Sequence, residues 1–331
     1  SKRLKTIQQE KLNNQVAELD VATSENSIQE SIAQIYIQIL YAAESVRVNE
    51  NTLQVSIAQR DRGQELLNAG SIAKSDFAQL EAQVSTDRYQ LVTAQATLQD
   101  YKLQLKQLLE LDGENEMNIY LPALSDENVL SPLPAKRDVY VSALALRPEI
   151  EASKLNVNAS ELGIDIAKSG YLPTVSLSAG IGTNHTSGSD FTFGEQVKNG
   201  WNNSIGLSVS VPIFNNRQTK SAVQKAKLQY ETSMLSLLDE QKALYKTIEG
   251  LWLDANSSQQ RYAAANEKLK STQISYNLIS EQFNLGMKNT VELLTEKNNL
   301  LQAQQEQLQA KYMAILNTQL LKFYQGDKLA L

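Results

Sequence analysis

Apolar residues recur at steps of three and four along two long parts of the chain, residues 1–67 and 215–283. The clearest positions are Ile28, Ile32, Ile35, Ile39, Ala43 and Val46 in the first part, and Leu244, Ile248, Leu251 and Ala255 in the second. This spacing predicts helices with one buried stripe. Each helix would be roughly 100 Å long if unbroken. Helices of that length need partner helices beside them, as in a coiled coil or a bundle.

Both helical parts end in a similar sequence pattern. The chain reads NAGSIAKSD at 68–76 and NLGMKNTVE at 284–292. Gly70 and Gly286 lie 216 residues apart, and each is followed by an acid six positions later. A glycine after a helical run commonly ends the helix in the left-handed conformation. We therefore expect two hairpin tips at these places.

Helices are expected to restart after each tip, at about 76–111 and 291–323. Asn289 with Glu292 resembles a capping box, and Ser75 or Asp76 is expected to cap the first copy. The same 216-residue shift pairs Tyr36 with Trp252. The chain thus contains a helix–tip–helix unit twice, although ordinary helix caps would also explain the acids.

Two runs in the middle of the chain alternate strictly between aliphatic and Ser/Gly residues. They read YLPTVSLSAGIG from Tyr171 and NSIGLSVSVPIF up to Phe214. The aliphatic positions are Val175, Leu177, Ala179, Ile181, Ile205, Leu207, Val209 and Val211. Nine residues suffice for a tilted strand to cross a bilayer, and one apolar face suits a lipid-facing wall. A half-buried soluble hairpin has the same alternation. The long helices favour the membrane interpretation, because a lone hairpin has no other core to cover that face.

The rest of the middle is punctuated by proline. All six prolines lie between Pro122 and Pro212. Residues 112–137 are expected to form an extended linker, and 138–169 a short helix, a break at Arg147-Pro148 and a second helix. A polar loop is expected between the two strands.

Composition excludes several classes of protein. Aromatic residues make up only 6%, the net charge is −6 with mixed signs, and cysteine is absent. No basic patch indicates a nucleic-acid partner, and no apolar run is long enough for a transmembrane helix. His185 is the only histidine, and the sequence has no phosphate loop, nucleophile elbow or His/carboxylate metal cluster. We expect no catalytic residue, no metal site and no cofactor, and hence no enzyme.

Five motifs follow one another along the chain or overlap: YLPTVSLSAGIG, GLSVSVPIFNNRQTKSAVQKAK, FNLGMKNTVELLTEKNNL, LLNAGSIAKSDFAQLEAQ and LRPEIEASKLNVNASELGIDIAKSGYLP. Together they resemble the TolC-like outer-membrane efflux protein family. Their order and spacing cover essentially the whole chain. The resemblance implies a mainly α fold, with two long antiparallel helical hairpins in a periplasmic α-barrel and a β-hairpin in a membrane β-barrel.

The resemblance also implies a function. Such a protein is a homotrimeric channel in the outer membrane of a Gram-negative bacterium, with a large periplasmic domain. It contacts outer-membrane lipid and docks to a periplasmic adaptor and an inner-membrane pump for efflux or type I secretion. The implied domains are 1–111 (first hairpin), 112–170 (linker and equatorial helices), 171–214 (β-hairpin), 215–323 (second hairpin) and 324–331 (tail).

Residue by residue, the resemblance places the periplasmic gate at Ser75, Asp76, Phe283, Lys288 and Glu292. Phe283 replaces a gate tyrosine, which removes part of a hydrogen-bonded latch. Lys288 is expected to pair with Asp76, within one protomer or between protomers, and to hold the tip closed. The adaptor-docking turns would be Ala69, Gly70, Ser71, Leu285, Gly286 and Met287.

A competing interpretation is a periplasmic coiled-coil adaptor or scaffold without a channel. An adaptor would have one hairpin beside several short Gly-rich strands, whereas this chain repeats its hairpin and has one strand pair. Family members also have two more strands before the first long helix. Residue 1 lies inside a helical pattern, so we expect the chain to be a fragment of a longer protein.

Overall fold

The computed structural model describes residues 2–111, 119–120, 122 and 129–329. The chain divides into two compact units, Ser1–Asp20 with Glu149–Glu240, and Val21–Pro148 with Gln241–Leu331. Each unit takes segments from both halves of the sequence, because the helices α1 (Lys2–Asn68) and α7 (Gln218–Asn284) each contribute to both.

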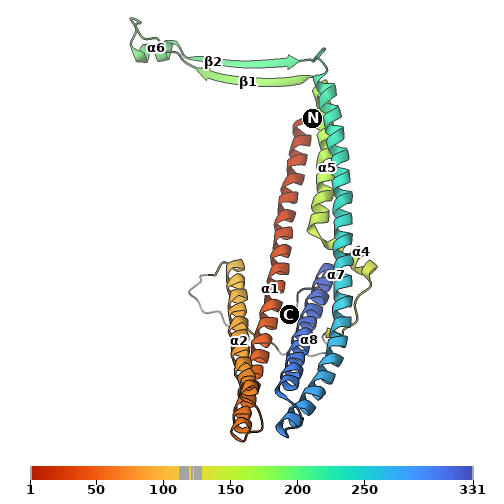
Figure 1. Cartoon of the computed structure of the whole chain (residues 1–331). Helices are drawn as coiled ribbons and strands as arrows, with labels where there is room; N and C mark the ends of the chain where they lie inside the picture. Colours follow the sequence, from red (N-terminus) through yellow and green to blue (C-terminus); the bar gives the residue numbers. More distant parts are fainter. Residues whose placement is uncertain (1, 112–118, 121, 123–128, 330–331) are drawn as a thin grey trace. The chain divides into compact units, whose positions relative to one another are not determined.

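The second unit contains two helix–turn–helix hairpins (Figure 1). α1 turns into α2 (Lys74–Leu108), and α7 turns into α8 (Thr290–Gln325). α1 and α7 both have 67 residues, and the first and last residues of the two helices differ by the same 216 positions. The expected fold class, mainly helical with two long hairpins and one β-hairpin, is confirmed.

The main core of this unit lies where α8 packs against the middle of α1 and α7. Its buried members are Ala33, Ile37, Leu40, Val129, Tyr262, Leu308, Tyr312, Ala314, Ile315, Leu316 and Leu320. The rings of Tyr41 and Tyr312 meet edge to face with centroids 6.4 Å apart. More than half of the buried set belongs to α8, so this helix joins the two hairpins into one packed body.

Two shorter helices are separated by a break at a proline. α4 (Lys136–Leu146) packs against α8 in the second unit, and α5 (Pro148–Lys168) belongs to the first. Arg147 between them is extended, with ψ 124°, because the residue before a proline is disfavoured in the helical region. The expected break at Arg147-Pro148 is confirmed.

The first unit joins the start of α1 to α5. Lys5 Nζ lies 2.5 Å from Asp165 Oδ2, and Gln9 Nε2 donates to Ala159 O at 2.8 Å. A short 3-10 turn, Ser169–Tyr171, follows α5. These polar contacts hold the start of α1 beside α5.

The strands of the first unit form one antiparallel pair. β1 (Thr174–Gly182) and β2 (Asn202–Ser210) have nine residues each. Where a polar loop was expected between them, the structure instead has the short helix α6 (Phe193–Asn199). Its start is fixed by a capping box, in which Thr192 N donates to Glu195 Oε2 at 3.0 Å. The predicted polar loop therefore contains a short helix that was not expected.

Candidate functional site

The two hairpin tips have the same turn geometry. Gly70 has φ +75° and Gly286 has φ +73°, both in the left-handed region. Each turn contains the two hydrogen bonds of a Schellman motif. These are Ser71 N to Leu66 O (2.8 Å) and Gly70 N to Leu67 O (2.9 Å) in the first tip, and Met287 N to Gln282 O (2.8 Å) and Gly286 N to Phe283 O (2.9 Å) in the second. The repeated sequence pattern thus encodes a repeated backbone turn.

The acids that follow the glycines both sit in the first turn of the next helix. In the second tip Asn289 Oδ1 accepts from Glu292 N at 2.9 Å, and Glu292 Oε2 accepts from Asn289 N at 3.1 Å. This confirms the expected capping box at Asn289.

The first tip has only half of that arrangement. Ala73 is the N-cap residue of α2, and its N–H donates to Asp76 Oδ2 at 3.2 Å. Ala73 has no side-chain acceptor to return the bond. The expectation that Ser75 or Asp76 is the cap was wrong, since Asp76 acts from the third helical position and Ser75 lies within the first turn.

Lys288 forms its ion pair within its own tip. Its Nζ lies 2.5 Å from Glu292 Oε1, one helical turn away, and both side chains are about one-third exposed. The hydrogen bond from Lys288, with that from the Asn289 backbone, lowers the pKa of Glu292. Within the chain, Lys288 therefore pairs with Glu292 and not with Asp76, because the capping box already brings the Glu292 side chain back toward the start of α8.

Phe283 lies in the interior of the hairpin pair. It is 2% exposed and packs with Leu80 and Leu293, with Leu66, Tyr276 and Leu294 around them. This small cluster joins α2 of the first hairpin to α7 and α8 of the second. An aromatic ring at this point contributes apolar contact, while the polar gate candidates Ser75, Asp76, Lys288 and Glu292 lie nearer the surface.

The tip turns themselves are open to solvent. The exposed set comprises Ala69, Gly70, Ser71, Leu285, Gly286 and Met287. Leu285 and Met287 are 75% and 70% exposed, and Val291 beside them is 57% exposed. The second tip thus presents an apolar surface, which is a property of sites that contact other proteins.

The strand pair has one aliphatic face and one Ser/Gly face. Across it, Val175 faces Val209, Leu177 faces Leu207 and Ala179 faces Ile205, while Ser176 faces Ser208. Leu177, Ile205 and Leu207 are each more than 70% exposed. Val211, which was placed with the strand, lies one residue beyond the end of β2. The aliphatic face has no cover within the described chain, so its chemistry suits an apolar surrounding.

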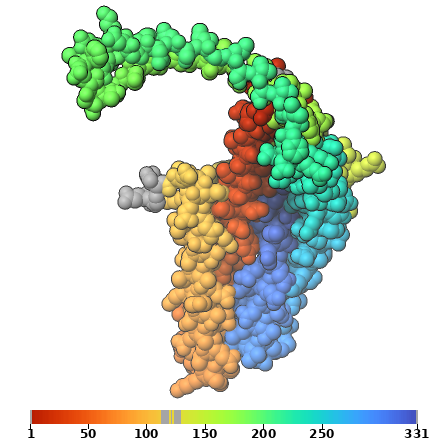
Figure 2. All heavy atoms as spheres, turned by 90° about the horizontal axis from the view of Figure 1, so that it is seen from above, coloured from red at the N-terminus to blue at the C-terminus, as the bar shows by residue number. Residues whose placement is uncertain are grey.

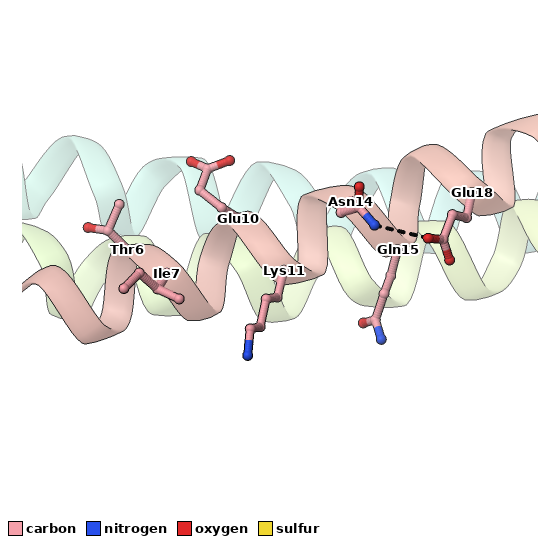
Figure 3. Close-up of a pocket in the computed structure, with 7 residues that line it drawn as sticks. All are labelled: Thr6, Ile7, Glu10, Lys11, Asn14, Gln15 and Glu18. Carbon is pink, nitrogen blue, oxygen red and sulfur yellow. Dashed lines mark hydrogen bonds between the residues drawn. The ribbon is translucent and has the colours of Figure 1, made fainter.

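A surface hollow of about 590 Å³ lies along the start of α1 (Figure 3). All seven lining residues come from this one helix: Thr6, Ile7, Glu10, Lys11, Asn14, Gln15 and Glu18. Figure 3 shows the side chains of Lys11 and Gln15 pointing one way and that of Glu10 the other, and Asn14 Nδ2 donates to Glu18 Oε1 at 2.9 Å. The side chains do not converge on a common point, so this hollow is a poor candidate for a ligand site.

The described residues have neither a metal-binding cluster nor a membrane-spanning helix. They contain no group of three or more His, Cys, Asp or Glu side chains arranged to hold a metal ion. None of the helices in that part of the chain has an apolar stretch sufficient to span a bilayer.

Comparison with known proteins agrees with this geometry. The chain is 25% identical over 315 residues to the outer membrane protein TolC of Escherichia coli K12, covering 91% of this chain and 62% of TolC. It is 24% identical over 294 residues to the outer membrane efflux protein BepC of Brucella suis, covering 88% and 61%. The chain thus spans about three-fifths of the length of these relatives.

Solved structures show the same fold. The CusC channel superposes with a TM-score of 0.84 at 18% identity, covering 99% of this chain and 74% of CusC. The Campylobacter jejuni CmeC outer membrane channel superposes with a TM-score of 0.80 at 19% identity, covering 100% and 69%. The model of the family described as "Outer membrane efflux protein" matches residues 139–326, more than half of the sequence. The chain therefore belongs to the outer membrane efflux protein family.

Proposed function

We propose that this chain is part of a passive exit duct through the outer membrane and periplasm of a Gram-negative bacterium. The duct would serve a tripartite efflux or type I secretion system. The family match and the relatives named as outer membrane efflux proteins support this proposal. Membership of that family agrees with the expectation that the chain is not an enzyme.

The observation that carries the proposal is the combination of a two-faced strand pair with a repeated long hairpin. The strands have the length and the alternation of a membrane wall, with aliphatic residues on one face and Ser and Gly on the other. Three copies, each with further strands from the longer protein, would close a barrel around water and place the aliphatic face against outer-membrane lipid.

The helical hairpins would form the periplasmic part of the duct in the proposed homotrimer. The domain boundaries remain those proposed from the sequence, with hairpins at 1–111 and 215–323 on either side of the strand region 171–214. The adaptor and scaffold alternative has less support. A protein located wholly in the aqueous periplasm would leave the aliphatic strand face exposed to water.

The tips would form the periplasmic gate. Three copies of Asp76 and Glu292 around one narrow opening would repel anions and concentrate cations. Ser75 and Lys288 would complete the polar rim, and buried Phe283 would act by holding the second hairpin against the first. The ion pair of Lys288 with Glu292 is open to solvent, and such pairs are weak, so a docking partner has little to overcome there.

The exposed tip turns would receive the periplasmic adaptor, with an inner-membrane pump beyond it. Leu285 and Met287 offer apolar contact area, and the two Schellman turns, which have the same geometry, offer two similar backbone surfaces per chain. Binding there would bias the second hairpin toward an open position.

The test is single-channel conductance of the full-length protein in planar lipid bilayers. We expect discrete conductance steps, and a larger conductance for Lys288→Glu, which removes the cation and adds a third acid per chain to the rim. Lys242→Glu, an exposed charge on α7 far along the chain from the tip, is the matched control and should leave conductance unchanged. An absence of any conductance would overturn the channel, and equal conductance for Lys288→Glu would overturn the gate role of Lys288.

A further inference from the structure

Three helices contribute one side chain each to a buried polar contact between the two hairpins. Ser56 on α1 and Asp87 on α2 are both 2% exposed, and Lys297 on α8 is 3% exposed. Polar and charged side chains are seldom fully buried unless they are paired. These three residues, which we call the polar cluster, all belong to the second unit.

The polar cluster is internally satisfied. Lys297 Nζ donates to Asp87 Oδ2 and to Ser56 Oγ, and Ser56 Oγ donates to the same carboxylate oxygen. The other oxygen, Asp87 Oδ1, accepts from Gln83 Nε2 at 2.9 Å. Burial lowers the pKa of Lys297, and its hydrogen bond to Asp87 opposes that shift. One ion pair therefore joins the first hairpin to the second.

The neighbours of Lys297 on α8 are apolar. Leu293 precedes it by about one turn and Leu301 follows it by about one turn, and both are buried. If α8 slid by one turn along the first hairpin, a leucine would face Asp87, and the buried carboxylate would lose its cation. Leucine contacts alone would not distinguish the observed alignment of α8 from one shifted by a turn, because leucine lies one turn before Lys297 and one turn after it. A single polar position in such a stripe is a known means of fixing register.

Within the first hairpin, the alignment of α1 against α2 is fixed by a separate contact. A Cβ atom at Gly63 on α1 would lie only 2.3 Å from Leu80 Cδ1 on α2, so the leucine fills the space that this glycine leaves. α1 and α2 are thus matched by shape. The atoms of α2 also adjoin those of the second hairpin (Figure 2), where α2 contacts α8.

We propose that Ser56, Asp87 and Lys297 are positioning residues that fix the register of α8 against the first hairpin, and so set where the second tip lies relative to the first. The polar cluster supplies specificity of alignment more than stability. A buried ion pair can often be replaced by apolar residues without loss of stability, whereas removing one partner is strongly destabilising.

The experiment measures the distance between the two tips in the full-length protein. The chain has no cysteine, so nitroxide labels at Ser71→Cys and Met287→Cys, both exposed, report one distance by pulsed electron paramagnetic resonance. Labelled chains are diluted with an excess of unlabelled chains, so that distances within one chain dominate. The parent should give one narrow distribution.

The decisive variant is Asp87→Leu with Lys297→Met. We expect the same or a higher melting temperature than the parent, together with a broadened distribution or a second peak displaced by about 5.4 Å, one helical turn. Lys297→Met alone should lower the melting temperature. The matched control is Glu306→Leu with Lys268→Met, an exposed ion pair of 2.7 Å between α7 and α8, which should leave the distribution narrow.

Two outcomes would overturn the proposal. One is a folded apolar variant with the narrow distribution of the parent, which would mean that register is set elsewhere. The other is an apolar variant that melts below Lys297→Met, which would make the polar cluster a stability element. The distance measurement does not depend on channel activity, so it fails or succeeds independently of the proposed function.

Discussion

Tyr36 and Trp252, which lie 216 residues apart, both donate a side-chain hydrogen bond to the segment between α2 and α4. Tyr36 Oη donates to Tyr120 O at 2.7 Å, and Trp252 Nε1 donates to Pro134 O at 3.0 Å. They occupy matching positions of α1 and α7, so the repeat extends from the tips to the place where the connecting segment is held. Each long helix thus anchors one part of the same connection.

Removing these donors should loosen the connection. Trp252→Phe keeps an aromatic ring but loses the bond to Pro134 and weakens the contact with the Lys136 ammonium, 5.1 Å from the ring centroid. We expect the free energy of unfolding to fall by about 1–2 kcal/mol, and by about 0.5–1 kcal/mol for the more exposed Tyr36→Phe. Urea denaturation measures both. Tyr89→Phe, at a ring that is 74% exposed, is the control, and an equal loss there would contradict the assignment.

Arg147 joins three elements of the second unit. Its guanidinium lies 3.2 Å from Glu30 Oε1, and its Cζ lies 4.2 Å from the ring centroid of Tyr324. The Arg147 side chain is only 10% exposed. Lysine cannot reproduce both the planar stacking and the hydrogen-bonding fork of arginine.

Arg147→Lys is therefore expected to lower the free energy of unfolding by about 1–3 kcal/mol despite the unchanged charge. Chemical denaturation followed by circular dichroism gives the value. Arg60→Lys, whose partner Asp61 is 62% exposed, should change it by no more than about 0.5 kcal/mol. A similar small effect at Arg147 would show that the stacking contributes nothing.

The two helix restarts have different N-cap residues, Ala73 in the first tip and Asn289 in the second, which suggests a reciprocal pair of substitutions. Asn289→Ala removes the side-chain cap of α8 and should cost about 1 kcal/mol. Ala73→Asn supplies the missing acceptor in the first tip, where the backbone already has the extended conformation of a cap, φ −82° and ψ 158°. Ala73→Asn should therefore raise the free energy of unfolding by a similar amount. Melting temperatures of both variants test this, and a destabilised Ala73→Asn would mean that the first tip cannot accept a full capping box.

Much of the fold follows from local sequence patterns. The glycines at 70 and 286 and the alternation of Val175 to Ile181 each specify a backbone conformation without help from distant residues. The break before Pro148 is likewise a local steric effect. Helix α6 had a local signal as well, the Thr192–Glu195 capping box, which the polar composition of the surrounding loop concealed.

The interaction partners of charged and aromatic side chains were harder to predict from the sequence. Lys288 has an acid four residues away as well as the one expected across the tips, and the capping geometry at Asn289 decides between them. Phe283 faces the core because the last turn of α7 places position 283 on the side of the helix that packs against α2 and α8. The burial of Lys297 could not be predicted from the local sequence, because most lysines in helices are exposed. It depends on how three helices pack together.

The pKa of Glu292 predicts how acid affects the second tip. Hydrogen bonds from Lys288 and Asn289 lower this pKa below its ordinary value of about 4.5. The unfolded chain therefore binds the proton more tightly than the folded one, and the stabilisation present above the ordinary value is lost as pH falls through the folded pKa. Glu292→Gln should lower the melting temperature near neutral pH, and the difference from the parent should shrink in acid. Glu240→Gln, an exposed residue of α7, is the control, and a difference that grows in acid would contradict the sign.

The glycines of the tips are expected to be required for their backbone conformation and not for space. A Cβ at Gly70 or Gly286 would meet no atom within 4 Å, yet both residues have φ above +70°. Gly70→Ala and Gly286→Ala should therefore each lower the free energy of unfolding by about 1–2 kcal/mol, the cost of the left-handed conformation for an L-residue. Gly250→Ala is the matched control, because that glycine lies inside α7 with equally open surroundings. There alanine should stabilise the helix by about 0.5–1 kcal/mol. Destabilisation at Gly70 and Gly286 together with stabilisation at Gly250 would establish backbone strain as the cause. Stabilisation at all three positions would show that the tips relax to another turn.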